Sequence, residues 1–216
     1  MSDDIQAGKG HRPLATKSVD FTMMYVAHAA FTRDLRRLSR ENERGQARTP
    51  VARAQWAMFT KQLHIHHRAE DTALWPLLRA AALRPDESDV IDQMEREHAQ
   101  IDPQLERIDV AFASDDGALL GEEIQALAST LTAHMRHEED AALPLVEAHL
   151  GAAGWAKFGA AIRQTQGLRG AAEYLPWLLD DVSTEVQAKV LKMLPPPVRF
   201  LYRRSWAPAY RRRVPQ

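Results

Sequence analysis

Four stretches of this chain repeat apolar residues at helical spacing, and each carries a histidine within its apolar stripe. Short polar breaks separate the stretches, which cover residues 18–40, 51–82, 89–113 and 118–149. Long amphipathic helices with short connections pack as antiparallel neighbours. The sequence therefore predicts an all-α fold in which residues 18–150 form an up-down four-helix bundle.

The bundle sequence is an internal repeat of one helix pair, in which the first helix carries a single histidine and the second a His-x-x-x-Glu motif. An offset of 68 residues, from His66 to His134, superposes the two motifs. An offset of 70, from His28 to His98, superposes the two single-histidine helices. If the two pairs close face to face, these side chains meet at the bundle axis. The complete set is His28, His66, Glu70, His98, His134 and Glu138.

The chemistry of this set points to metal binding. Residues four apart share one helix face, so each His-x-x-x-Glu motif directs two polar groups to one place. Six polar groups in one core layer, paired only with each other, would be costly unless something binds them. The chain has no cysteine, so a metal would be held by imidazole and carboxylate, which suit iron or another first-row metal. Two carboxylates in one site suggest two ions that they bridge.

This set of histidines and glutamates resembles the hemerythrin-like (HHE cation-binding) family over about residues 18–150, and the tail is similar to that of actinobacterial hemerythrin-like proteins. The resemblance implies a non-haem di-iron centre inside a four-helix bundle. It implies two iron ions per chain, joined by an oxo or hydroxo bridge and by carboxylates. The four histidines would be terminal ligands, while Glu70 and Glu138 would bridge the ions.

One position departs from the oxygen-carrying members of this family, which have His-x-x-x-His on the third helix. Here Met94 occupies the position four residues before His98, so the site resembles a four-histidine branch. With fewer imidazoles and more exchangeable positions, we expect the diferrous protein to become oxidised by oxygen rather than to carry it reversibly. Candidates for a further ligand, or for a residue that contacts a ligand, are Tyr25, Met94, Glu95 and His137.

For residues beside the six expected ligands, the sequence gives less specific predictions. His67 lies about 100° around the helix from its neighbour His66, so we expect it to be solvated or to contact a ligand from outside. Asp71, Glu139 and Asp140 are expected to orient imidazole N–H groups or to face solvent.

A ferritin-like di-iron bundle is the competing interpretation. Glu95 and His98 form one Glu-x-x-His motif, but that architecture needs two such motifs, and the second is missing.

Prolines within the helical stretches give a separate expectation, since each removes a backbone N–H. We expect kinks at Pro76, Pro103 and Pro144.

Residues 151–216 differ in charge from the rest of the chain. They hold 11 Lys and Arg against 4 Asp and Glu, a balance of +7, so with a net charge of -1 the remainder carries -8. We expect this basic extension to pack on the acidic bundle, after a flexible N-terminus of residues 1–17. Nucleic acid is not an expected partner, whereas a protein partner of the tail stays open. No apolar run predicts a membrane span or a signal peptide, and the lack of cysteine favours the cytoplasm.

The function expected from these features is binding of, or reaction with, a small diatomic ligand or peroxide. The ligands considered are O2, NO and H2O2, in oxidative or nitrosative stress, and an enzymatic scavenging activity is one form of this function. The alternative is a protein that senses or stores oxygen or iron without turnover. A third hypothesis is a regulatory protein whose tail contacts a partner when the iron state changes.

Overall fold

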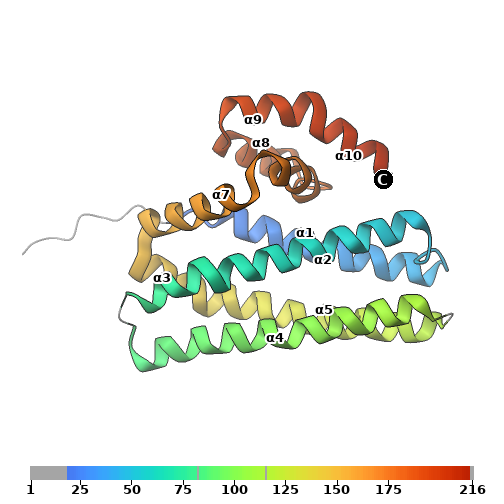
Figure 1. The fold of residues 1–216 in the computed structure, drawn as a ribbon, viewed down its shortest axis with the longest axis horizontal. Helices are drawn as coiled ribbons and strands as arrows, with labels where there is room; N and C mark the ends of the chain where they lie inside the picture. The colour runs from blue at the N-terminus through green and yellow to red at the C-terminus, as the bar shows by residue number, and fades with distance from the viewer. Residues whose placement is uncertain (1–18, 82, 115, 215–216) are drawn as a thin grey trace, which may run out of the picture.

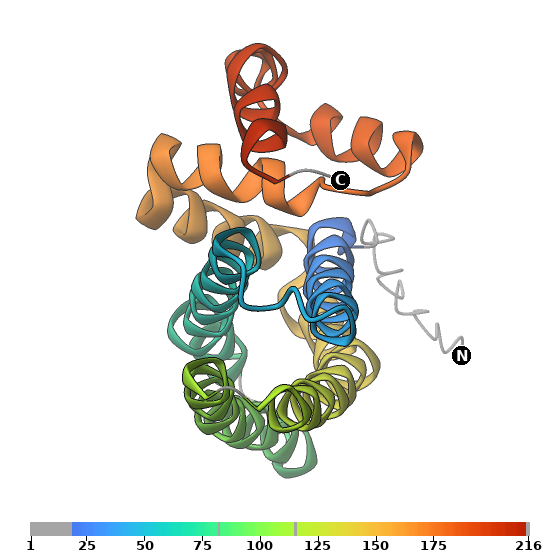
Figure 2. The ribbon, with the colours of Figure 1, turned by 90° about the vertical axis from the view of Figure 1, so that its right-hand side faces the viewer.

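The computed structural model describes residues 19–81, 83–114 and 116–214, and this part of the chain is largely helical and contains no strand. Figure 1 shows long helices lying side by side, and Figure 2 shows the bundle helices arranged as a ring when viewed end-on. The predicted all-α bundle is confirmed. Its four long helices are α1 (Thr22–Glu43), α2 (Pro50–Ala69), α4 (Pro85–Ala113) and α5 (Gly117–His137).

Local sequence signals set where these helices begin. Before α2, the Thr49 side chain accepts a hydrogen bond from a backbone N–H, and Pro50 occupies the first turn. Helix α5 begins after Asp116, whose carboxylate accepts two backbone N–H groups. Helix α4 begins at Pro85, earlier than the predicted residue 89, because Glu87 accepts the backbone N–H of Arg84 and closes a cap.

The second helix of each repeat widens into a π-helical turn directly after its histidines. These turns are η1 (Glu70–Leu74) and η2 (Glu138–Ala142), and they lead into α3 (Trp75–Arg79), α6 (Leu143–Leu145) and a third π turn, η3 (Val146–Leu150). The prolines at 76 and 144 have no N–H to give to an α-helical ladder, and a π turn accommodates that loss. Pro103, where a kink was expected, lies inside an unbroken α4.

The bundle interior consists of two apolar clusters with a polar layer between them. One cluster includes the residues one turn to one side of the histidines: Phe31, Leu63, Ile101 and Leu131. The other lies on the opposite side and includes residues four positions from a histidine or a glutamate of the layer: Met24, Leu74, Met94 and Ala142. The histidines and glutamates therefore lie in a layer shielded by apolar side chains above and below.

The predicted helical extension is also present, beside α1 and α2 (Figure 2). It comprises α7 (Gly151–Leu178), α8 (Thr184–Met193), α9 (Pro196–Leu201), η4 (Tyr202–Trp206) and α10 (Ala207–Arg213). Helix α7 changes direction at Gly167, whose φ of 58° suits glycine. No helix within the described ranges combines the length and apolarity needed to cross a membrane.

The extension is anchored to α1 by contacts around Trp177. The Trp177 ring packs against Phe31, with centroids 5.1 Å apart, and its indole N–H donates to Asp34 at 2.7 Å. The Arg33 guanidinium donates to the backbone carbonyls of Trp177 and Asp180. These contacts hold the C-terminal end of α7 against α1.

Candidate metal centre

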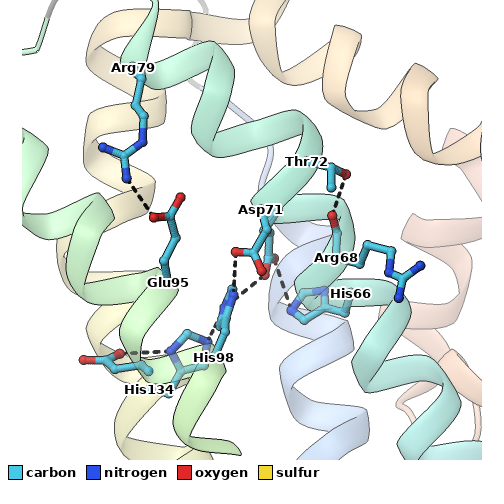
Figure 3. A network of polar contacts seen from close by, with 10 residues as sticks. His66, Arg68, Asp71, Thr72, Arg79, Glu95, His98 and His134 are labelled. Atoms are coloured by element: carbon cyan, nitrogen blue, oxygen red, sulfur yellow. Dashed lines mark hydrogen bonds and ion pairs between the residues drawn. The ribbon is translucent and has the colours of Figure 1, made fainter. Parts of the chain in front are cut away.

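Each bundle helix contributes its motif histidine to the polar layer, and the two glutamates stand at the first positions of the π turns. Five of the six side chains are buried, and His66 is 14% exposed. Figure 3 shows the His66, Asp71, His98 and His134 part of this network. The structure thus brings all six predicted residues to one place.

The first group of potential ligands consists of His28, His66 and Glu138. One nitrogen or oxygen of each lies within 4.8 Å of the others. His28 Nε2 is 3.1 Å from Glu138 Oε2, across the bundle between α1 and η2. The distances are short enough for a single ion to contact all three.

The second group consists of His67, His98 and His134, again with ligand atoms within 4.8 Å. His98 Nε2 and His134 Nε2 are 3.1 Å apart. Glu70 lies between the two groups, since its Oε1 is 3.3 Å from His66 Nε2 and its Oε2 is 3.6 Å from His98 Nε2. One carboxylate therefore reaches a histidine of each group.

Carboxylates behind the histidines determine which ring nitrogen faces inward. Nδ1 of His28 lies 2.6 Å from Glu139 Oε1, and Nδ1 of His98 lies 2.8 Å from Asp71 Oδ1. An ionised carboxylate only accepts hydrogen bonds, so each Nδ1 carries the proton. Nε2 is left with a lone pair directed into the site.

Glu97 gives His134 the same arrangement, because its carboxylate is 3.0 Å from His134 Nδ1. Sequence reasoning anticipated Asp71 and Glu139 but missed Glu97. Glu97 adjoins His98 in the chain yet serves a histidine on a different helix. That relation becomes visible only when α4 and α5 are set side by side.

The inward atoms of the layer face one another rather than hydrogen-bond partners elsewhere in the protein. Two Nε2 lone pairs face each other between His98 and His134, and neither can donate to the other while both rings are neutral. The Nε2 atoms of His28 and His66 and the carboxylate oxygens of Glu70 and Glu138 are buried without a hydrogen-bond partner. Buried polar atoms without partners are costly, and every one of these is an electron-pair donor. The residues present therefore fit a bound metal cation.

Titration behaviour supports the same interpretation. Burial and the nearby charge of Glu138 raise the pKa of Glu70 well above its ordinary value. Burial and the proximity of His28 lower the pKa of His66 to about 3. Burial also lowers the pKa of His28, but Glu138 and Glu139 outweigh it and raise that pKa to about 9. Without a metal, His28 therefore also holds a proton on Nε2, 3.1 Å from Glu138 Oε2, and a bound cation would take the place of that proton.

Comparison with known proteins agrees with this donor set, since a family model described as the hemerythrin HHE cation-binding domain matches residues 19–146. The chain belongs to the hemerythrin HHE family. The match covers the bundle and both His-x-x-x-Glu motifs. No curated protein and no solved structure matches the chain.

The further ligands suggested for this HHE site have other surroundings. Tyr25 is 47% exposed, and its ring packs edge-on against Phe21. Glu95 is turned outward to Arg79, 2.9 Å away (Figure 3). Met94 is fully buried in the apolar cluster next to the layer.

His137 lies outside the two groups, whereas His67 lies inside the layer. His137 stands behind the site, with its Nδ1 2.9 Å from Glu97, so it contacts a residue that orients His134. His67 is only 6% exposed, and its ring stacks on His98 with centroids 4.0 Å apart. The expectation that His67 could be solvated is corrected, since its ring is buried against His98 and one of its nitrogens lies near those of the second group.

Proposed function

We propose that this protein is a di-iron protein that binds or reacts with O2, NO or H2O2 in oxidative or nitrosative stress. The proposal gives the terminal ligand role to the four histidines of the family motif and the bridging role to Glu70 and Glu138. The observation that carries it is the position of Glu70, whose two oxygens approach histidines of two separate groups. A single-ion site would not need a carboxylate between two clusters of nitrogen donors.

The chain's own residues prepare this site for cations in three ways. Asp71, Glu97 and Glu139 hold the histidine protons on the outer ring nitrogens, so the inner lone pairs are free. Burial keeps water from the glutamate oxygens. The apolar clusters on both sides confine ligands to the polar layer. When bound, the iron pair supplies redox chemistry toward small oxygen- and nitrogen-containing molecules.

Metal analysis after anaerobic loading with Fe(II) tests the proposal. We expect two irons per chain, and after exposure to oxygen the absorption spectrum of an oxo- or hydroxo-bridged diferric protein. One iron per chain, or a preference for zinc in iron-replete cells, would contradict the bridging role of the glutamates.

Steady-state assays distinguish the proposed reactivity from the alternative of sensing or storage without turnover. We expect consumption of H2O2 by the iron-loaded protein, measured with and without NO, and little by the metal-free protein. A loaded protein that releases oxygen unchanged through repeated cycles would contradict the proposed reactivity while leaving the iron site intact.

A further inference from the structure

The two halves of the bundle differ at one buried position next to the site. The 68-residue offset that superposes His66 on His134 also superposes His67 on Met135. Both side chains are 6% exposed. One half therefore has an imidazole where the other half has a thioether of similar burial. Buried His is harder to explain by packing alone than buried Met.

The surroundings of His67 are those of a ligand position. One of its ring nitrogens lies within 4.8 Å of ligand atoms of both His98 and His134. Its ring is stacked on His98 at an interplanar angle of 10°, and it meets His134 edge-on at 84°. The inner nitrogens of the other two rings are already 3.1 Å apart, close to the spacing of two neighbouring ligands on one ion.

We propose, as a refinement of the di-iron function above, that His67 is a third imidazole ligand of the ion held by His98 and His134. The motif of single histidines and His-x-x-x-Glu pairs does not include this position. The ion of the second group would then have three nitrogen ligands, and the ion of the His28 and His66 group would have two. The two ions are chemically inequivalent despite the internal repeat.

Binding requires a small rotation of this ring. A ring lying flat on His98 holds a shared ion outside its own plane, so His67 must tilt off the stack. His98 is fixed by Asp71 at 2.8 Å. Among the described residues, no carboxylate is within ion-pair distance of His67, so nothing comparable opposes its rotation.

The test uses the full chain loaded anaerobically with Co(II) or Fe(II) and a substitution that keeps the stack. His67→Phe leaves a flat aromatic ring on His98 but removes the nitrogen. His64→Phe is the matched control, since His64 lies on the same helix with its side chain 52% exposed. The readouts are the paramagnetically shifted, exchangeable imidazole N–H signals in the proton NMR spectrum and the Kd of each ion.

We expect five shifted N–H signals in the natural protein and in His64→Phe, and four in His67→Phe. We also expect the Kd of the weaker ion in His67→Phe to rise about 10–100-fold or more, at least as much as when a partner of a ligand is lost. Four signals in the natural protein would overturn the proposal without any variant, and an unchanged Kd in His67→Phe would do the same. Failure of the natural protein to bind two ions would instead contradict the di-iron function.

Discussion

Glu70 is the residue whose state depends most on a bound cation. It is fully buried, its oxygens have no hydrogen-bond partner, and Glu138 opposes its ionisation. An ionised group in this setting is costly unless paired, whereas beside two cations it becomes a stabilising ligand. The contribution of Glu70 to the free energy of unfolding is therefore unfavourable without metal and favourable with it.

Glu70→Gln is expected to separate these two contributions. The metal-free variant should melt at the same temperature as the natural protein or higher, because a buried ionisable group is gone. The iron-loaded variant should melt lower and hold fewer than two irons per chain. Differential scanning calorimetry and metal analysis check this. Glu95→Gln is the control, because the natural Glu95 side chain points outward and pairs with Arg79. An equal fall in both states would mean that Glu70 has only a structural role.

In the proposed site Asp71 would act on the metal only through His98, which it holds in one tautomer and orientation. Asp71→Ala should therefore raise the Kd for Fe(II) about 10–100-fold while two irons still bind at saturation. Competition with a coloured chelator measures the change. Asp102→Ala is the control, because Asp102 is exposed and pairs with His64. Loss of one iron at saturation would indicate that Asp71 itself is a ligand.

Sequence periodicity identified the motif residues because each stands on an apolar stripe, where an imidazole or carboxylate is conspicuous. It gave no reliable position for His67, since about 100° of helical rotation separates that residue from His66 and the π turn begins soon afterwards. It also missed Glu97, whose partner His134 is on another helix. Contacts across helices depend on their register, which helical spacing does not contain.

At the level of elements, the π turns connect the proline positions with the glutamates. Each turn begins at a glutamate of the site and ends just before a Trp-Pro or Leu-Pro pair. The prolines predicted a distortion, but a π turn rather than a simple bend is what the structure contains. In α4, by contrast, the α-helix continues through Pro103 without a π turn. A proline in the sequence shows that one backbone hydrogen bond is missing, but whether the helix stays α-helical or forms a π turn depends on its packing.

The cap of α4 makes stability depend on pH independently of the metal. Glu87 accepts the backbone N–H of Arg84 and lies 3.1 Å from His149 Nε2, and these contacts lower its pKa below the ordinary 4.5. A carboxyl whose folded pKa is depressed stabilises the protein above its unfolded pKa, and that stabilisation is lost as the pH falls through the folded value.

Glu87→Gln should accordingly lower the melting temperature of the metal-free protein at pH 7. The difference from the natural protein should shrink as the pH falls below about 4.5, because the natural side chain then becomes neutral as well. Thermal melts followed by circular dichroism over this pH range measure it. A difference that stays constant with pH would show that the charge of Glu87 contributes nothing.

On the scale of the whole molecule, Trp177 links the extension to the bundle. It is 1% exposed, packs on Phe31 and bonds to Asp34. Trp177→Ala should destabilise the protein by about 3–5 kcal/mol, measured by urea unfolding, while iron binding is retained. Phe200→Ala is the control, since Phe200 is 63% exposed. Loss of iron along with the docking contact would show that the extension is needed to form the site.

If iron occupies the proposed site, its removal should destabilise the whole molecule, because ligands would come from four bundle helices and both π turns. A ligand that binds only the folded state stabilises it by about 2.7 kcal/mol at 100 times its Kd. For a chain of this size each kcal/mol shifts the melting temperature by about 2–4 °C. For one occupied site at this ligand concentration, we therefore expect the melting temperature to fall by about 5–10 °C on chelation. For two occupied sites we expect a larger fall.

The chelator itself needs a control that lacks the site but keeps the bundle. The double variant His66→Ala, His134→Ala removes one nitrogen from each group, so its melting temperature should respond little to chelator or to added Fe(II). In the natural protein, re-addition of Fe(II) should restore the higher melting temperature, which excludes damage by the chelator. A natural protein whose melting temperature is the same with and without iron would show that the metal does not join the four helices, because cross-links between all of them cannot be removed without cost.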